Sequence, residues 1–119
     1  MSTPEGRVKG KVRAKLKEVE AWAFAPITMG AFGRHGIPDI IACVPTEITQ
    51  EMVGKTIGAF VAIETKAPGK TKHTTPNQRR ELIEIYNAFG VAIVTDDVKD
   101  VEEALEHLSH GDTDYKVPT

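Results

Sequence analysis

The chain has 119 residues, of which 40% are hydrophobic and 27% charged, and it contains a single cysteine. This length and composition predict one folded domain and exclude disorder over most of the chain. A lone cysteine excludes a disulfide framework, and no apolar run approaches the roughly 20 residues that a membrane helix needs. We therefore expect a soluble, cytoplasmic protein without a membrane partner.

The formal net charge of −2 hides an uneven distribution of charge along the chain. Residues 1–38 carry a net charge of +4, residues 39–95 are neutral, and residues 96–119 carry −6. This separation predicts a basic face at one end of the molecule and an acidic, solvated region at the other. The small net charge therefore does not exclude a nucleic-acid partner.

Residues 3–21 are predicted to form the first helix. Thr3 is a suitable N-cap and Pro4 a suitable first helical residue. Lysines and arginines cover much of the helix outside one apolar stripe, which consists of Val8, Val12, Leu16 and Val19. Most basic amphipathic helices are simply solvated on their charged side, and contact with phosphates is the alternative interpretation.

Two strands are predicted next, at residues 23–29 and 38–44, and a loop with three glycines joins them. Glycine-rich loops that hold nucleotide phosphates normally lead into a helix, whereas this loop leads into a strand. We therefore expect no nucleotide cofactor. A long polar connection at residues 45–57 precedes a third strand at residues 60–66.

The remaining elements are predicted from clear start and stop signals. Thr75 and Pro76 begin a helix that ends before Gly90, and an apolar strand at residues 91–95 and a helix at residues 98–108 follow. Residues 109–119 are predicted to be a flexible tail. The order is therefore αβββαβα, and the helical crossover implies that the last strand lies parallel to the third.

Charged residues stand at the ends of two apolar strands, where burial is costly unless something binds them. Glu64 and Lys66 share one face of the third strand, and Asp39 lies near the start of the second. One interpretation is an ion pair between Glu64 and Lys66, with Asp39 in a local turn. The other is a site for Mg²⁺ or Mn²⁺, with Asp39, Glu64 and the Thr65 carbonyl as ligands and Lys66 beside a bound water.

The same residues resemble the signature of a nuclease superfamily. Pro38-Asp39 followed by Glu64-Thr65-Lys66 resembles the PD-(D/E)xK motif. Over residues 5–108 the chain is similar to the VRR-NUC branch, in particular to its small stand-alone phage and bacterial members. Four segments carry this similarity: Gly36-x-Pro38-Asp39-Ile40-Ile41, Glu64-x-Lys66-Ala67-x-Gly69, Thr75-Pro76-x-Gln78 and Gly90-x-Ala92-x-Val94.

The resemblance implies an α/β fold with a PD-(D/E)xK, restriction-endonuclease-like core. Its first three strands would form an antiparallel meander within a mixed sheet flanked by helices, all in one nuclease domain over residues 1–108.

The implied activity is Mg²⁺-dependent endonucleolytic hydrolysis of DNA, with Mn²⁺ able to substitute. Cutting would be structure-specific, on Holliday junctions or flaps, or nonspecific. The alternative is a non-catalytic DNA-binding subunit for recombination that retains the nuclease fold. We also expect a homodimer and, if a phage encodes the protein, a place in the host cytoplasm.

The resemblance further assigns roles to individual residues. Asp39, Glu64, Lys66 and Gln78 match catalytic positions, and Gln78 would orient the lysine and the attacking water. Taken alone, Gln78 would be an ordinary amide at a helix N-terminus. Glu5 is a candidate ligand of a second metal, although an acid is favourable in a first helical turn without one. The candidate DNA contacts are Arg34, His35, Lys70, Lys72, Arg79 and Arg80, with Lys9, Lys11 and Arg13 as further candidates.

Overall fold

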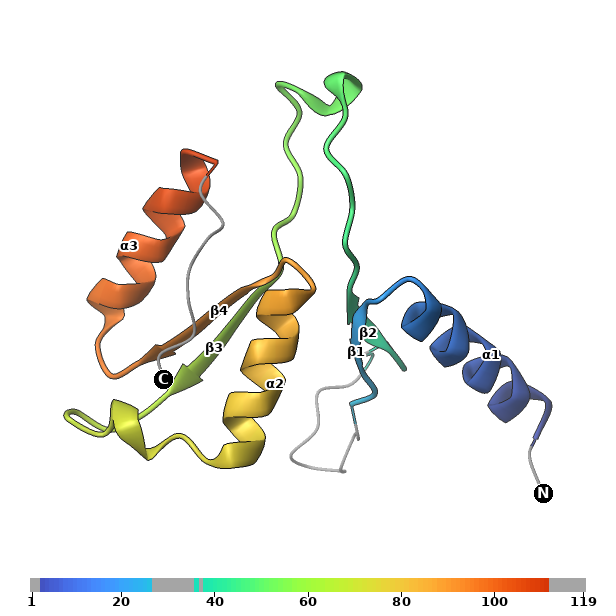
Figure 1. The fold of residues 1–119 in the computed structure, drawn as a ribbon, viewed down its shortest axis with the longest axis horizontal. Helices are drawn as coiled ribbons and strands as arrows, with labels where there is room; N and C mark the ends of the chain where they lie inside the picture. Colours follow the sequence, from blue (N-terminus) through green and yellow to red (C-terminus); the bar gives the residue numbers. More distant parts are fainter. Residues whose placement is uncertain (1–2, 27–35, 37, 112–119) are drawn as a thin grey trace. The chain divides into compact units, whose positions relative to one another are not determined.

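The computed structural model describes residues 3–26, 36 and 38–111 (Figure 1). The chain divides into two compact units, Met1–Thr46 and Glu47–Thr119. The single domain expected over residues 1–108 stays a prediction.

The described elements follow the predicted order. They are α1 (Pro4–Glu18), β1 (Trp22–Phe24), β2 (Ile41–Cys43), β3 (Val61–Thr65), α2 (Pro76–Asn87), β4 (Val91–Thr95) and α3 (Val98–Ser109). Two short 3₁₀ helices, at Gln50–Met52 and Thr71–His73, lie in the connections on either side of β3.

The first unit contains α1 and the antiparallel pair of β1 and β2. Thr3 caps α1 as predicted, because its Oγ1 accepts a hydrogen bond of 2.9 Å from the Gly6 amide. The helix ends at Glu18 rather than at residue 21, since Glu20 adopts a left-handed backbone with φ of 61°. In the strand pair, Ala23 lies opposite Ala42. The parts of the predicted strands and loop that fall on residues 27–35 and 37 lie outside the described residues.

Cys43 is the buried residue of β2, with 5% of its surface exposed. Burial raises the pKa of its thiol, because an apolar environment disfavours the thiolate. These properties agree with the role of a small core residue rather than a reactive thiol.

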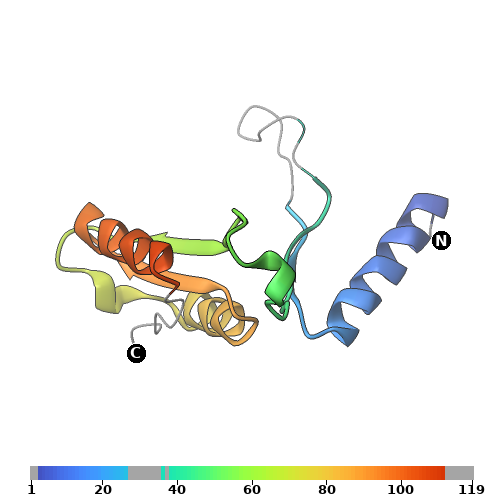
Figure 2. The ribbon, with the colours of Figure 1, turned by 90° about the horizontal axis from the view of Figure 1, so that it is seen from above.

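The second unit is a parallel β3–β4 pair with a helix on each face. Figure 2 shows α2 and α3 on opposite sides of the two strands. The register pairs Val61 with Val91 and Thr65 with Thr95, so the parallel relation predicted for these strands is confirmed. Every residue of β4 is buried, as expected for a strand covered on both faces. The core on the α3 side contains Val91, Ile93 and Ala104, with Val61 and Leu108 packed against it.

The strands within the described residues thus form two sheets of two strands each. The mixed α/β class and the antiparallel pairing of the first two strands are confirmed. The continuous sheet with β2 beside β3 stays a prediction, because these two strands belong to different units.

The C-terminal part of the described chain is the helix α3. α3 extends one residue beyond its predicted end, to Ser109, and most of the predicted tail, residues 112–119, lies outside the described residues. No helix within the described ranges has the length and apolar character needed to cross a membrane.

Two isoleucines of α2 provide a test of which side of the helix faces the strands. Ile85 is 4% exposed and Ile83 is 41% exposed. We expect Ile85→Ala to lower the free energy of unfolding by about 2–4 kcal/mol, because it leaves a cavity in the core. The matched variant Ile83→Ala should cost less than about 1 kcal/mol, because its side chain is already partly in water. Urea unfolding measures both, and equal losses would contradict the burial of α2 described here.

Candidate active site

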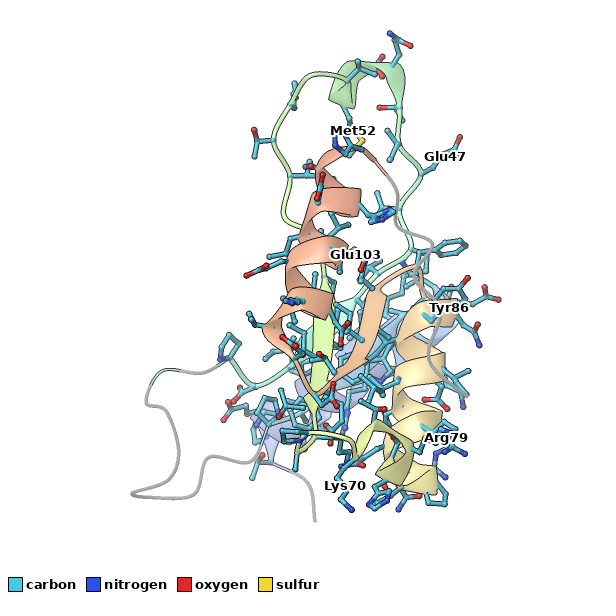
Figure 3. The ribbon with its side chains drawn as sticks, turned by 90° about the vertical axis from the view of Figure 1, so that its left-hand side faces the viewer. Glu47, Met52, Lys70, Arg79, Tyr86 and Glu103 are labelled. Atoms are coloured by element: carbon cyan, nitrogen blue, oxygen red, sulfur yellow. The ribbon has the colours of Figure 1, made fainter. Side chains whose placement is uncertain are left out.

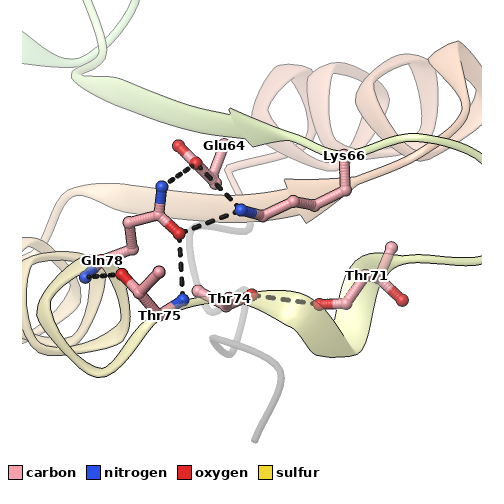
Figure 4. Close-up of polar contacts among 6 residues, drawn as sticks. All are labelled: Glu64, Lys66, Thr71, Thr74, Thr75 and Gln78. Carbon is pink, nitrogen blue, oxygen red and sulfur yellow. Dashed lines mark hydrogen bonds and ion pairs between the residues drawn. The ribbon is translucent and has the colours of Figure 1, made fainter.

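Three of the predicted catalytic side chains meet at the carboxyl end of β3. Glu64 lies in β3, Lys66 directly follows the last residue of that strand, and Gln78 comes from the first turn of α2 (Figure 4). The Gln78 Nε2 donates a hydrogen bond of 2.5 Å to Glu64 Oε1. The Lys66 Nζ donates to Gln78 Oε1 at 3.0 Å and lies 3.5 Å from Glu64 Oε1. The structure therefore brings Glu64, Lys66 and Gln78 into one hydrogen-bonded cluster.

The position of Gln78 follows from the way α2 begins. Thr75 is the N-cap, and its Oγ1 accepts a hydrogen bond of 3.1 Å from the Gln78 amide. The Gln78 Oε1 in return accepts one of 3.0 Å from the Thr75 amide, which completes a capping box. The same oxygen also accepts from Lys66. Gln78 thus ties the start of the helix to the charged end of β3.

The partners of Gln78 determine the orientation of its side-chain amide. Its oxygen faces two donors, the Thr75 amide and the Lys66 ammonium, and its nitrogen faces the Glu64 carboxylate. A flipped amide would place its NH₂ group against both donors and its oxygen against the carboxylate. Only the observed orientation satisfies all three neighbours.

The Glu64–Lys66 pair is partly shielded from water. The exposed fraction of the side chain is 29% for Glu64 and 16% for Lys66. The ion pair that one interpretation of the sequence expects is therefore present, but it is not a simple solvated pair, because Gln78 binds both partners. Such a shielded, hydrogen-bonded arrangement fixes the direction in which each charged group points.

Asp39 and Glu5 belong to the first unit. The Asp39 side chain is 64% exposed, and its Oδ2 lies 3.7 Å from the Lys9 Nζ, which was predicted only as a DNA contact. Glu5 is exposed in the first turn of α1, and Lys11 and Arg13 are also exposed on that helix. Because Asp39 and Glu64 lie in different units, the predicted sharing of a metal between them stays a prediction. Among the described residues, no group of three or more His, Cys, Asp or Glu side chains is arranged to hold a metal ion.

The predicted DNA contacts of the second unit lie around the start of α2. Figure 3 shows Lys70 and Arg79 at this end of the unit. Lys70, Lys72 and Arg80 are exposed, whereas Arg79 is partly buried and its Nε has no hydrogen-bond partner among the residues that the structure describes. Arg34 and His35, the other two candidates, lie outside the described residues. An open pocket on α2 is lined by Pro76, Arg79, Arg80, Ile83 and Glu84.

One polar residue at this edge of the sheet, Asp96, was not predicted to contribute to it. Asp96 directly follows β4, and its Oδ2 accepts a hydrogen bond of 2.7 Å from the Gly69 amide in the loop after β3. The available signal was the parallel relation of the two strands, which places the residues after Thr65 and Thr95 at the same edge.

Comparison with known proteins identifies no similar family, protein or structure. No family model, curated protein or solved structure matches the chain.

Proposed function

We propose that the protein is a metal-dependent nuclease of the VRR-NUC type that hydrolyses phosphodiester bonds in DNA. The observation that carries the proposal is the cluster of Glu64, Lys66 and Gln78 at the carboxyl end of β3. A partly shielded ion pair alone would not need the amide bridge. The three residues also stand at the spacing of the nuclease signature, which is a separate argument from the sequence.

The chemistry of the donor atoms fits a hard divalent cation. Within the described part of the chain, the hydrogen bond from Gln78 and the ion pair with Lys66 both fall on Oε1 of Glu64, which leaves Oε2 available as a ligand. Among the described residues, the partner of the exposed Asp39 carboxylate is Lys9, in a weak surface ion pair at 3.7 Å. We propose that Asp39, Glu64 and the Thr65 carbonyl hold Mg²⁺, with Mn²⁺ able to replace it and Glu5 as a candidate ligand of a second ion. A bound Mg²⁺ supplies Lewis-acid activation of the phosphoryl group and of the attacking water.

Lys66 stabilises negative charge on the phosphoryl group in this proposal. An ammonium has three N–H donors; one donates to Gln78 Oε1, and the ion pair with Glu64 Oε1 at 3.5 Å occupies at most a second. The third donor is left for a phosphoryl oxygen. Because Gln78 and Glu64 fix the ammonium in advance, little reorganisation is needed as charge develops in the transition state. This geometry favours charge stabilisation by Lys66 over proton abstraction, since a neutral amine would have one donor fewer.

The cations around the start of α2 hold the DNA backbone in this proposal. Phosphate contacts made by exposed lysines and arginines give affinity without base readout, so they suit an enzyme that recognises DNA structure or cuts nonspecifically. The proposed contacts are Lys70, Lys72, Arg79 and Arg80, with Arg34, His35, Lys9, Lys11 and Arg13 from the first unit. A homodimer acting on branched or flapped DNA is the proposed assembly, and sedimentation that shows only monomer at high concentration would remove it.

The direct test uses labelled linear, flapped and four-way-junction DNA with Mg²⁺, Mn²⁺ or EDTA. We expect cutting with either metal and none with EDTA, because the carboxylates cannot activate the phosphoryl group without a cation. The Lys66→Ala protein, purified in parallel, controls for contaminating nucleases. DNA binding without cutting in every metal would reject the enzyme and favour a non-catalytic DNA-binding subunit. Failure to bind DNA at low salt would reject both.

A further inference from the structure

A hydrogen bond to Asp96 connects the loop that follows Lys66 to the end of β4. Its Oδ2 accepts the hydrogen bond of 2.7 Å from the Gly69 amide across 27 residues of sequence. The backbone supports this contact, because the Lys66 amide donates to the Thr95 carbonyl at 2.9 Å just before the loop begins. A charged acceptor makes a stronger hydrogen bond than a neutral one, so this bond is suited to holding a loop in place.

The loop begins with a tight turn at residues 67–70. The Lys70 amide donates to the Ala67 carbonyl at 2.9 Å, and Pro68 and Gly69 occupy the two central positions. Gly69 has a φ of 78°, which a type II turn requires at its third residue. A Cβ at Gly69 would meet no atom within 4 Å, so the glycine is needed for its backbone conformation and not for space.

The rest of the loop is held by hydrogen bonds between residues close in sequence. The His73 amide donates to the Lys70 carbonyl at 2.9 Å, and the Thr74 hydroxyl donates to the Thr71 carbonyl at 3.0 Å. The capping box of Thr75 and Gln78 follows directly. The path from Lys66 to Gln78 is therefore a succession of hydrogen-bonded turns, and the Asp96–Gly69 bond connects that succession to β4.

We propose that Asp96 is a positioning residue that holds the basic loop, residues 67–74, in the conformation in which Lys70 and Lys72 contact DNA phosphates. The inference rests on the proposed function. The direction of the change in DNA affinity on replacing Asp96 distinguishes positioning of the loop from simple electrostatic repulsion. A carboxylate close to a phosphate-binding loop repels DNA, so its removal should strengthen binding if charge were its only contribution. If Asp96 positions the loop, a variant that loses both the charge and the hydrogen bond binds DNA more weakly than an equally uncharged variant that keeps the hydrogen bond.

Three variants of Asp96 separate charge from hydrogen bonding. Asp96→Asn removes the charge and keeps an oxygen that can accept from Gly69, whereas Asp96→Ala removes both. Asp96→Glu keeps the charge and displaces the oxygen by one methylene, so it carries the test if the alanine variant does not fold. Glu102→Ala is the matched control, because it removes one exposed carboxylate from α3. Urea unfolding checks that all four proteins are folded.

The first readout is hydrogen exchange at the Gly69 amide, which does not depend on DNA. We expect exchange to quicken by about 10-fold or more in Asp96→Ala and Asp96→Glu, and to stay near that of the wild type in Asp96→Asn and Glu102→Ala. Unchanged exchange in both the alanine and the glutamate variants would overturn the role of Asp96, whatever the protein does to DNA.

The second readout is the Kd for a four-way junction in EDTA, where no cutting can occur. We expect Asp96→Asn to bind as tightly as the wild type or more tightly, and Asp96→Ala to bind about 3- to 10-fold more weakly than Asp96→Asn. Equal binding by these two variants, with faster exchange in the alanine protein, would overturn the link between loop order and DNA affinity. A wild-type protein that does not bind DNA would overturn the inference together with the proposed function.

Discussion

The Lys66→Ala protein is expected to bind DNA and to cut it at least about 10²–10³ times more slowly than the wild type, because a preorganised donor to the phosphoryl group is lost. The substitution leaves the 2.5 Å bond between Gln78 and Glu64 in place, so the carboxylate keeps a hydrogen-bond partner. The N-cap of α2 also stays intact, since the Thr75 amide still donates to Gln78. We therefore expect loss of activity without loss of the fold.

Single-turnover cleavage of labelled DNA in Mg²⁺ measures this effect, and DNA binding in EDTA measures affinity separately. Lys70→Ala is the matched control, because it removes an exposed ammonium from the adjoining loop. We expect that variant to bind DNA more weakly, with a salt dependence reduced by roughly one phosphate contact, and to keep its rate of cleavage once saturated. A Lys66→Ala protein with near-normal turnover would remove Lys66 from the catalytic machinery.

Gln78 connects the fold of the second unit to its chemistry. As the third residue of α2 it is part of a capping box, and as a side-chain amide it bridges Glu64 and Lys66. A glutamate at this position could also cap the helix, but it would place a second carboxylate against Glu64. The choice of glutamine is thus explained by the charged end of β3 and not by the helix alone.

Local signals were sufficient to predict most element positions. The sequences Thr3-Pro4 and Thr75-Pro76 mark the starts of α1 and α2, because a hydroxyl cap and a proline in the first turn satisfy or remove unpaired amides. The strand at Val91–Thr95 matches its prediction, since a run of apolar residues is bounded by Gly90 and Asp96. The end of α1 was predicted too late, because the left-handed backbone of Glu20 gives no clear sequence signal.

Contacts between distant residues were less accessible from the sequence. The motif predicted that Gln78 lies close to Lys66 and Glu64, and the contacts among the three side chains confirm their proximity, whereas their catalytic role stays a prediction. The Asp96–Gly69 bond was missed, because it depends on the register of two parallel strands 30 residues apart. The ion pair of Lys9 with Asp39 was missed for a similar reason. Lys9 lies on α1 and Asp39 lies just before β2, and no local sequence pattern predicts a contact between a helix surface and the start of a distant strand.

Asp39→Ala is expected to reduce cleavage as strongly as Lys66→Ala, but through a different step. If Asp39 is a ligand of Mg²⁺, its loss should shift the dependence of the cleavage rate to higher Mg²⁺ concentrations, and it should lower the amount of Mn²⁺ that the protein binds. Folding stability should change little, because the Asp39 side chain is 64% exposed and its ion pair with Lys9 is a surface pair.

Lys9→Ala is the matched variant for this test, since it breaks the same ion pair from the other side. A cation near a carboxylate competes with a metal for it, so we expect Lys9→Ala to need the same Mg²⁺ concentration as the wild type or less. Both variants lose the ion pair, but Asp39→Ala alone loses the carboxylate. Comparing them therefore separates the role of Asp39 as a metal ligand from its role in a surface ion pair. An Asp39→Ala protein with wild-type Mg²⁺ dependence and Mn²⁺ binding would exclude Asp39 from the metal site and leave the contact with Lys9 as its observed role.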